Sequence, residues 1–155
     1  MVVELRRFSG VDELVKRLDT VLERYNKVLS VLLRVLEEYR VVAEGEKRIR
    51  QLIERLGGRG GGGGGGGLVF DVDGCVVMVN PSAGDVVRFL EERIEEINNR
   101  VARIQQVRRR LSQLADALQG FPVVALIVDD VPVLVLVAAS PVSPLLEAAS
   151  GGGGG

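Results

Sequence analysis

The sequence contains no histidine, no tryptophan and a single cysteine, and only 4% of its residues are aromatic. Histidine is the commonest general base and a frequent zinc ligand, so its absence removes the usual means of acid–base and zinc chemistry. Cys75 alone forms neither a disulfide framework nor a cysteine-based metal site, and its position in an apolar run predicts a small, buried hydrophobic residue. These absences favour a cytoplasmic protein that is not an enzyme and that binds no metal or cofactor.

The sequence also lacks an excess of charge of either sign. The formal net charge is −1 over 155 residues, and both long helical patterns carry nearly equal numbers of basic and acidic residues. This balance argues against nucleic acid or an anionic membrane as a partner. The N-terminus lacks the apolar run of a signal peptide, and the apolar stretch 121–139 contains Asp129 and Asp130. We therefore expect neither secretion nor a membrane span.

A long hydrophobic repeat is the strongest pattern that the sequence does contain. Across residues 11–56, apolar residues recur at alternating steps of three and four, with Glu46 as the one polar member, and Ser9 with Asp12 predicts the start of this helix. A 3.5-residue period held over six heptads predicts a left-handed coiled coil. This first seam consists of Val11, Leu14, Leu18, Val21, Tyr25, Val28, Leu32, Val35, Tyr39, Val42, Glu46, Ile49, Ile53 and Leu56.

A second heptad seam lies within residues 82–119 and predicts a second coiled-coil helix. Between the two helices, residues 57–67 are glycine except for Arg59, a composition that predicts a flexible linker. Arg108 is the one charged member of the second seam. This seam consists of Val87, Leu90, Ile94, Ile97, Val101, Ile104, Arg108, Leu111, Ala115 and Leu118.

A β-hairpin is predicted between the two helices, at residues 68–80. Two apolar runs flank Asp73-Gly74, the dipeptide that best supports a tight turn of the primed type. Ser82 then offers an oxygen for capping the second helix, and Asp85 in its first turn complements the helix dipole.

A second hairpin is predicted after the second helix, at residues 121–139. Its strands are rich in valine on both faces, so both faces need a partner. Residues 1–10 read as a short strand. Together with the second hairpin it forms either an exposed apolar tip or a three-stranded cap buried against the end of the helices. Residues 140–155 complete the chain as a C-terminal tail.

The order helix, β-hairpin, helix, with heptads on both helices, resembles the prefoldin family. The closest stretch is Gly74–Leu118, which begins GCVVMVNPSAGDVVRFLEERIEEINNRV and is similar to the second half of archaeal prefoldin subunits. The resemblance implies an ATP-independent holding chaperone, assembled from self copies or other prefoldin-like subunits, that binds non-native polypeptides at its coiled-coil tips. The polyglycine linker and the hairpin after the second helix depart from the family pattern.

The resemblance also assigns roles to residues. It implies that subunits assemble through the first hairpin, at Val69, Phe70, Val72, Val76, Val77, Met78 and Val79. It implies a client-binding tip, here called the tip residues, formed by Val2, Val3, Leu5, Phe8, Leu118 and Phe121.

A second resemblance points to a different class of protein. The run LVFDVDGCVV, with Asp71 and Asp73, is similar to the first motif of haloacid dehalogenase-type phosphatases, and ALIVDD, ending at Asp130, resembles their late acidic motif. That family uses the first aspartate as nucleophile, the second as acid/base, and Mg²⁺. However, no lysine follows Lys47, Ser140 comes after the late motif, and a coiled-coil helix occupies most of the chain between the two motifs.

The sequence thus predicts a mainly α protein. We expect an antiparallel two-helix coiled-coil hairpin with a small β-hairpin between the helices and a second β-hairpin after helix 2. The predicted function is that of a prefoldin-like holding chaperone. A structural coiled-coil adaptor that uses its hairpins only for assembly is the alternative, and a phosphatase is the more distant one.

Overall fold

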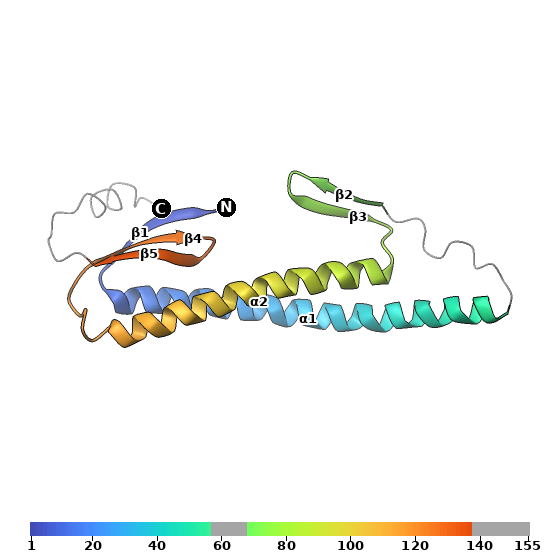
Figure 1. The fold of residues 1–155 in the computed structure, drawn as a ribbon, viewed down its shortest axis with the longest axis horizontal. Coiled ribbons are helices and arrows are strands. Elements are labelled where there is room, and N and C mark those ends of the chain that lie inside the picture. Colours follow the sequence, from blue (N-terminus) through green and yellow to red (C-terminus); the bar gives the residue numbers. More distant parts are fainter. Residues whose placement is uncertain (57–67, 138–155) are drawn as a thin grey trace. The chain divides into compact units, whose positions relative to one another are not determined.

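A computed structural model describes residues 1–56 and 68–137. Two helices dominate the described chain, and antiparallel strands form two small sheets (Figure 1). The predicted glycine linker at 57–67 and the predicted tail at 140–155 lie outside the described residues. The elements are β1 (Val3–Phe8), α1 (Val11–Arg55), β2 (Leu68–Val72), β3 (Cys75–Val79), α2 (Ala83–Leu114), β4 (Val123–Val128) and β5 (Val131–Val137).

The chain divides into two compact units. The first unit comprises Met1–Lys27 with Ile97–Gly155, and the second comprises Val28–Glu96. The first unit holds β1, β4 and β5, and the second holds the hairpin β2–β3. Neither helix of the described chain has the length and apolarity that crossing a membrane requires.

The first unit contains a three-stranded antiparallel sheet in the order β1-β4-β5 (Figure 1). β1 pairs with β4 from Val3 opposite Val128 to Phe8 opposite Val123. Pro132 lies on β5, where its missing N–H is tolerated because β5 is an edge strand. The prediction that the N-terminal strand joins the second hairpin in a three-stranded arrangement is therefore confirmed, and the alternative of an exposed strand is wrong.

One face of this sheet is buried together with the first turns of α1. Opposite residues in an antiparallel pair share a face, and alternate residues return to it, so Phe8 lies on the same face as the alternate β4 residues. Burying each large apolar side chain stabilises the fold by about 1.5–3 kcal/mol. The buried residues of this core include Phe8, Val11, Leu14, Leu18, Ile104, Val123, Ala125 and Ile127.

Helix α1 begins with a side-chain cap that differs from the predicted one. The backbone N–H and the hydroxyl of Ser9 both donate to the Glu13 carboxylate, whereas Asp12 was expected to partner Ser9. These two hydrogen bonds lower the pKa of Glu13 below its usual value. Glu13 makes the contact because the helix starts two residues after Ser9, which brings the fourth residue onward within reach of it.

The buried stripe of α1 follows the predicted seam only at first. Val11, Leu14, Leu18 and Val21 are buried, but Val28 is 44% exposed while its neighbour Leu29 is 8% exposed. The steps Leu14, Leu18 and Leu22 are two successive fours, and such an insertion shifts a heptad pattern to the adjacent position. Leu29 and Leu36 therefore replace Val28 and Val35 as the buried pair. The prediction of one strict repeat across 11–56 is wrong.

The prediction for α2 agrees better with the structure. Its seam is buried or half-buried throughout, including Ile94, Val101, Ile104 and Leu111. The Ser82 hydroxyl accepts a hydrogen bond from the backbone N–H of Asp85 at 3.2 Å, which confirms the predicted cap. The regular helix ends at Leu114, five residues before the predicted end.

Ion pairs and hydrogen bonds cross between the helices in the first unit. Arg108, the charged member of the second seam, pairs with Asp19 of α1, which raises the pKa of the guanidinium. Further along α1, the Tyr25 hydroxyl accepts a hydrogen bond from Arg100 of α2 at 3.3 Å. Because the α2 partner number falls as the α1 number rises, the two helical segments of this unit run antiparallel.

Candidate assembly surface

The turn of the β2–β3 hairpin is built by its own residues. Asp73 and Gly74 both have positive φ, at 51° and 84°, as a two-residue primed turn requires. The Asp71 carboxylate accepts a hydrogen bond from the Gly74 N–H at 2.8 Å. The register places Leu68 opposite Val79 and Val72 opposite Cys75, so all five residue pairs form around this turn. The hairpin that the sequence predicted at 68–80 is therefore present.

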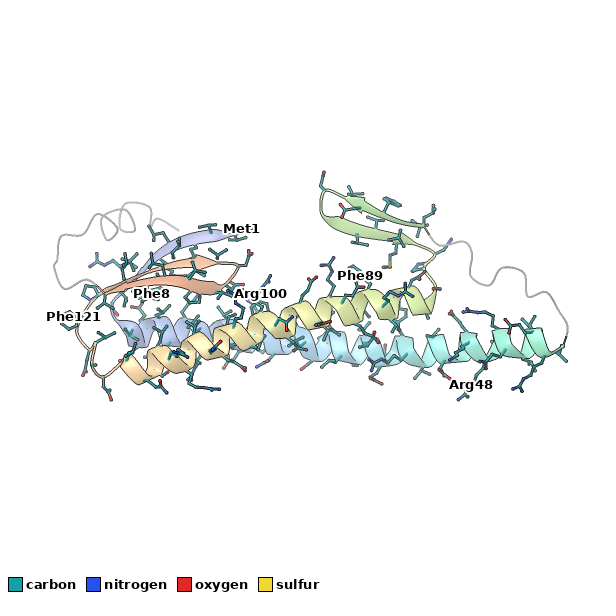
Figure 2. The ribbon with its side chains drawn as sticks, in the orientation of Figure 1. Met1, Phe8, Arg48, Phe89, Arg100 and Phe121 are labelled. Carbon is teal, nitrogen blue, oxygen red and sulfur yellow. The ribbon has the colours of Figure 1, made fainter. Side chains whose placement is uncertain are left out.

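The two faces of this hairpin differ in composition. Val69 and Met78 lie on one face and line a shallow groove of about 220 Å³ with α2 residues that include Phe89 (Figure 2). The opposite face is apolar throughout and exposed or half-exposed: Leu68 is 63% exposed and Phe70 is 47% exposed. We call it the outer hairpin face, and its residues are Leu68, Phe70, Val72, Cys75, Val77 and Val79.

The outer hairpin face holds four of the predicted assembly residues, namely Phe70, Val72, Val77 and Val79. The other three, Val69, Val76 and Met78, lie on the opposite face, which the sequence pattern did not separate. Cys75 is exposed, so the prediction that it is buried is wrong. Burial was expected from the apolar run around it, but a two-stranded hairpin has no third strand or second layer to cover this face.

The tip residues do not form a single exposed surface. Phe8 is 3% exposed and lies between β1 and the helices, so the expectation that it contacts clients is wrong (Figure 2). Its ring is buried because β1 pairs with β4 and directs it into the core. Val2, Val3 and Phe121 are exposed, the last at 40%. The remaining two tip residues, Leu5 and Leu118, are half-buried.

A polar network in the first unit connects the β4–β5 turn to both helices. The Tyr25 hydroxyl donates to Asp130 at 2.6 Å and accepts from Arg100, while Arg24 lies 3.6 Å from the Asp130 carboxylate. Burial, and then the hydrogen bond to Asp130, raises the pKa of Tyr25. The hydrogen bond to Tyr25 raises the pKa of Arg100. Our sequence analysis treated Tyr25 only as a seam residue. The need of a buried hydroxyl for a partner was the available signal.

The aspartates of the phosphatase-like motifs have structural roles in two turns. Asp71 and Asp73 shape the β2–β3 turn in the second unit. In the first unit, the Asp129 carboxylate accepts from the Val2 N–H at 2.8 Å, and Asp130 binds Tyr25. Both sheets among residues 1–56 and 68–137 are antiparallel, whereas the phosphatase family uses a parallel one. Ser140 lies outside the described residues.

Comparison of the chain with protein-family models, with curated proteins and with solved structures found no match. Its function has to be argued from its own residues. The features that bear on it are the exposed outer hairpin face, the buried three-stranded sheet and the balanced charge.

Proposed function

We propose that this chain is a subunit of an oligomer that assembles through the β2–β3 hairpin and holds non-native polypeptides without ATP. The observation that carries the proposal is the outer hairpin face, on which apolar side chains from both strands are exposed together. Contiguous exposed apolar surface in a folded protein marks an interaction site. The single exposed cysteine suits a reducing compartment such as the cytoplasm.

Hairpin energetics favour assembly over a free hairpin. An isolated two-stranded hairpin is marginally stable at best in water, and its unpaired edges accept further strands. One hairpin face offers less than the roughly 800 Å² that each partner of a stable interface buries. We therefore propose that several hairpins combine, using their faces and their edges, while α1 and α2 form an antiparallel coiled coil that projects from the assembly.

Absolute mass in solution tests the assembly. We expect a defined oligomer for the unmodified chain and a monomer for the double variant Phe70→Lys with Val72→Lys, because two charges on each outer hairpin face would have to be buried. The matched control is Val41→Lys on α1, another exposed valine in the second unit, which should leave the mass unchanged. A monomeric unmodified chain, or an oligomer that survives the double substitution, would overturn this site of assembly.

The single cysteine gives an independent measurement at the same surface. Cys75 lies on the outer hairpin face, so assembly should protect its thiol. We expect a maleimide reagent to label Cys75 slowly in the oligomer and at least tenfold faster in the double variant. Equal labelling rates in the two proteins would show that this face is not part of an interface.

Client holding is tested by suppression of aggregation. The oligomer, without ATP, should reduce light scattering from a chemically unfolded protein that is diluted into buffer. A structural adaptor is the second candidate, and the burial of Phe8 favours it because burial removes one residue from the client-binding tip. An oligomer of the expected kind that leaves scattering unchanged would reject the chaperone and retain the adaptor.

A further inference from the structure

The three-stranded sheet of the first unit has a second apolar face. The register places Leu5 opposite Leu126, Leu126 opposite Leu134, and Val124 opposite Leu136, so these residues share the face that Phe8 does not occupy. We call it the outer sheet face. Apart from Arg7 on β1, it is apolar, and its residues include Val3, Leu5, Val124, Leu126, Val128, Leu134 and Leu136.

The helices bury only one face of this sheet, the one that carries Phe8 and Val123. Strands that are apolar on both faces occur where both faces are covered. Val124, at the centre of the outer sheet face, is nevertheless only 2% exposed, whereas Val3 and Leu134 on the flanking strands are exposed. The face therefore needs a second cover.

The residues that follow β5 fit this requirement. β5 ends at Val137, and residues 138–150 read AASPVSPLLEAAS, with Glu147 as their one charge. Pro141 and Pro144 lack the N–H that pairing along the sheet edge uses, so this stretch is unsuited to extending the sheet as a regular fourth strand. Its apolar residues, Val142, Leu145 and Leu146, match an apolar face.

Length and tethering also favour this segment over another chain. Thirteen residues reach about 40 Å when extended, whereas the outer two strands of a three-stranded sheet lie only about 10 Å apart. A short tether raises the effective concentration of the segment to the millimolar range, which a second copy of the chain reaches only in concentrated solution. We propose that residues 138–150 fold back over the outer sheet face of their own chain and cover it.

Paramagnetic relaxation measures this contact directly. The lone Cys75 is replaced by serine, and Ala148→Cys carries a nitroxide label. We expect strong broadening of the methyl signals of Leu126, Leu134 and Leu136, and much weaker broadening of Leu14 and Leu18 in the core of the same unit. Absence of preferential broadening on the outer sheet face would overturn the proposal.

A mixed sample identifies the covering chain. Nitroxide-labelled chains without isotope are mixed with isotope-labelled chains that carry no nitroxide. Covering within one chain predicts that the preferential broadening disappears in the mixture, whatever the oligomeric state. Persistent broadening in the mixture would assign the cover to a second copy and would overturn the proposal, while leaving assembly through β2–β3 untouched.

Substitutions within the segment provide the matched comparison. Leu145→Asp with Leu146→Asp should reduce the broadening severalfold and raise the fluorescence of an apolar dye at least twofold, because the outer sheet face becomes accessible. Ser143→Asp with Ser150→Asp adds the same charge at polar positions and should change neither signal. Equal effects of both pairs would show that charge, and not apolar packing, is responsible, which contradicts the proposal.

Discussion

The hairpins β4–β5 and β2–β3 have similar sequences and opposite surroundings. Both consist of short apolar strands around an acidic turn with positive φ values. Most of β4 is buried between β1 and β5 and against the core of the first unit, whereas every residue of β2 is exposed. Strand composition thus specifies a hairpin without specifying its cover, which depends on a third strand and on a packed helix. The uncovered hairpin is the one available for assembly.

The largest difference should appear between the two tip phenylalanines. Phe8→Ala removes a ring from the core beneath the sheet and should lower the free energy of unfolding by about 3–5 kcal/mol. Phe121→Ala, at an exposed ring of the same unit, should lower it by less than about 1 kcal/mol. Denaturant unfolding followed by circular dichroism measures both. Equal losses would contradict the assignment of Phe8 to the core and return it to the exposed tip.

The next comparison concerns how each turn is anchored. The β4–β5 turn is bound to both helices through Tyr25, while the β2–β3 turn is capped by its own Asp71. Tyr25→Phe removes the hydroxyl from this network and should lower the free energy of unfolding by about 1 kcal/mol. Tyr39→Phe, an exposed tyrosine of the same helix, is the control and should have no measurable effect. A silent Tyr25→Phe variant would show that the network contributes nothing to anchoring the turn.

A smaller and local effect is expected at the β2–β3 turn. Asp71→Ala removes the acceptor of the Gly74 N–H, so amide exchange should accelerate within β2 and β3 while the unfolding of the first unit stays unchanged. Asp71→Asn retains an acceptor oxygen and should preserve the slow exchange. The same two proteins test the phosphatase alternative. Mg²⁺-dependent hydrolysis of a simple phosphate ester by the unmodified chain, lost in Asp71→Asn, would contradict a purely structural role.

Local signals in the sequence predicted the parts of the fold that local chemistry determines. The Asp73-Gly74 turn and the Ser82 cap depend on residues close together in the chain, and both are present. Heptad spacing predicted two long helices, because apolar periodicity is a property of each helix alone. The candidate assembly hairpin was also predictable, since its strands and its turn are contiguous.

The remaining features depend on partners distant in the sequence. The shift from Val28 to Leu29 reflects the position of the buried stripe, which a second helix and a sheet determine together. Phe8 is buried because β1 pairs with a strand more than a hundred residues later. Tyr25 finds Asp130 across a similar separation. A pattern of single residues does not specify such pairings, so the sequence left the tip and cap alternatives open.

The smallest effect concerns acid and the entry of β1 into α1. Two hydrogen bonds from Ser9 lower the pKa of Glu13, so the ionised carboxylate stabilises the folded chain above its unfolded pKa of about 4.5. This contribution is lost as the pH falls through the lower, folded pKa. Glu13→Gln should therefore lower the free energy of unfolding at pH 6 by about 0.5 kcal/mol or less, because the group is exposed.

The pH dependence of that difference separates the cap from other effects of the substitution. On acidification below pH 4, the unmodified chain loses the contribution of the carboxylate while Glu13→Gln has none to lose, so the two unfolding free energies should converge. Asp12→Gln, one residue earlier in the same first turn, lacks the Ser9 hydrogen bonds and serves as the control. A difference between Glu13→Gln and the unmodified chain that stays constant from pH 6 to pH 3 would show that the carboxylate does not hold β1 to the helix through its charge.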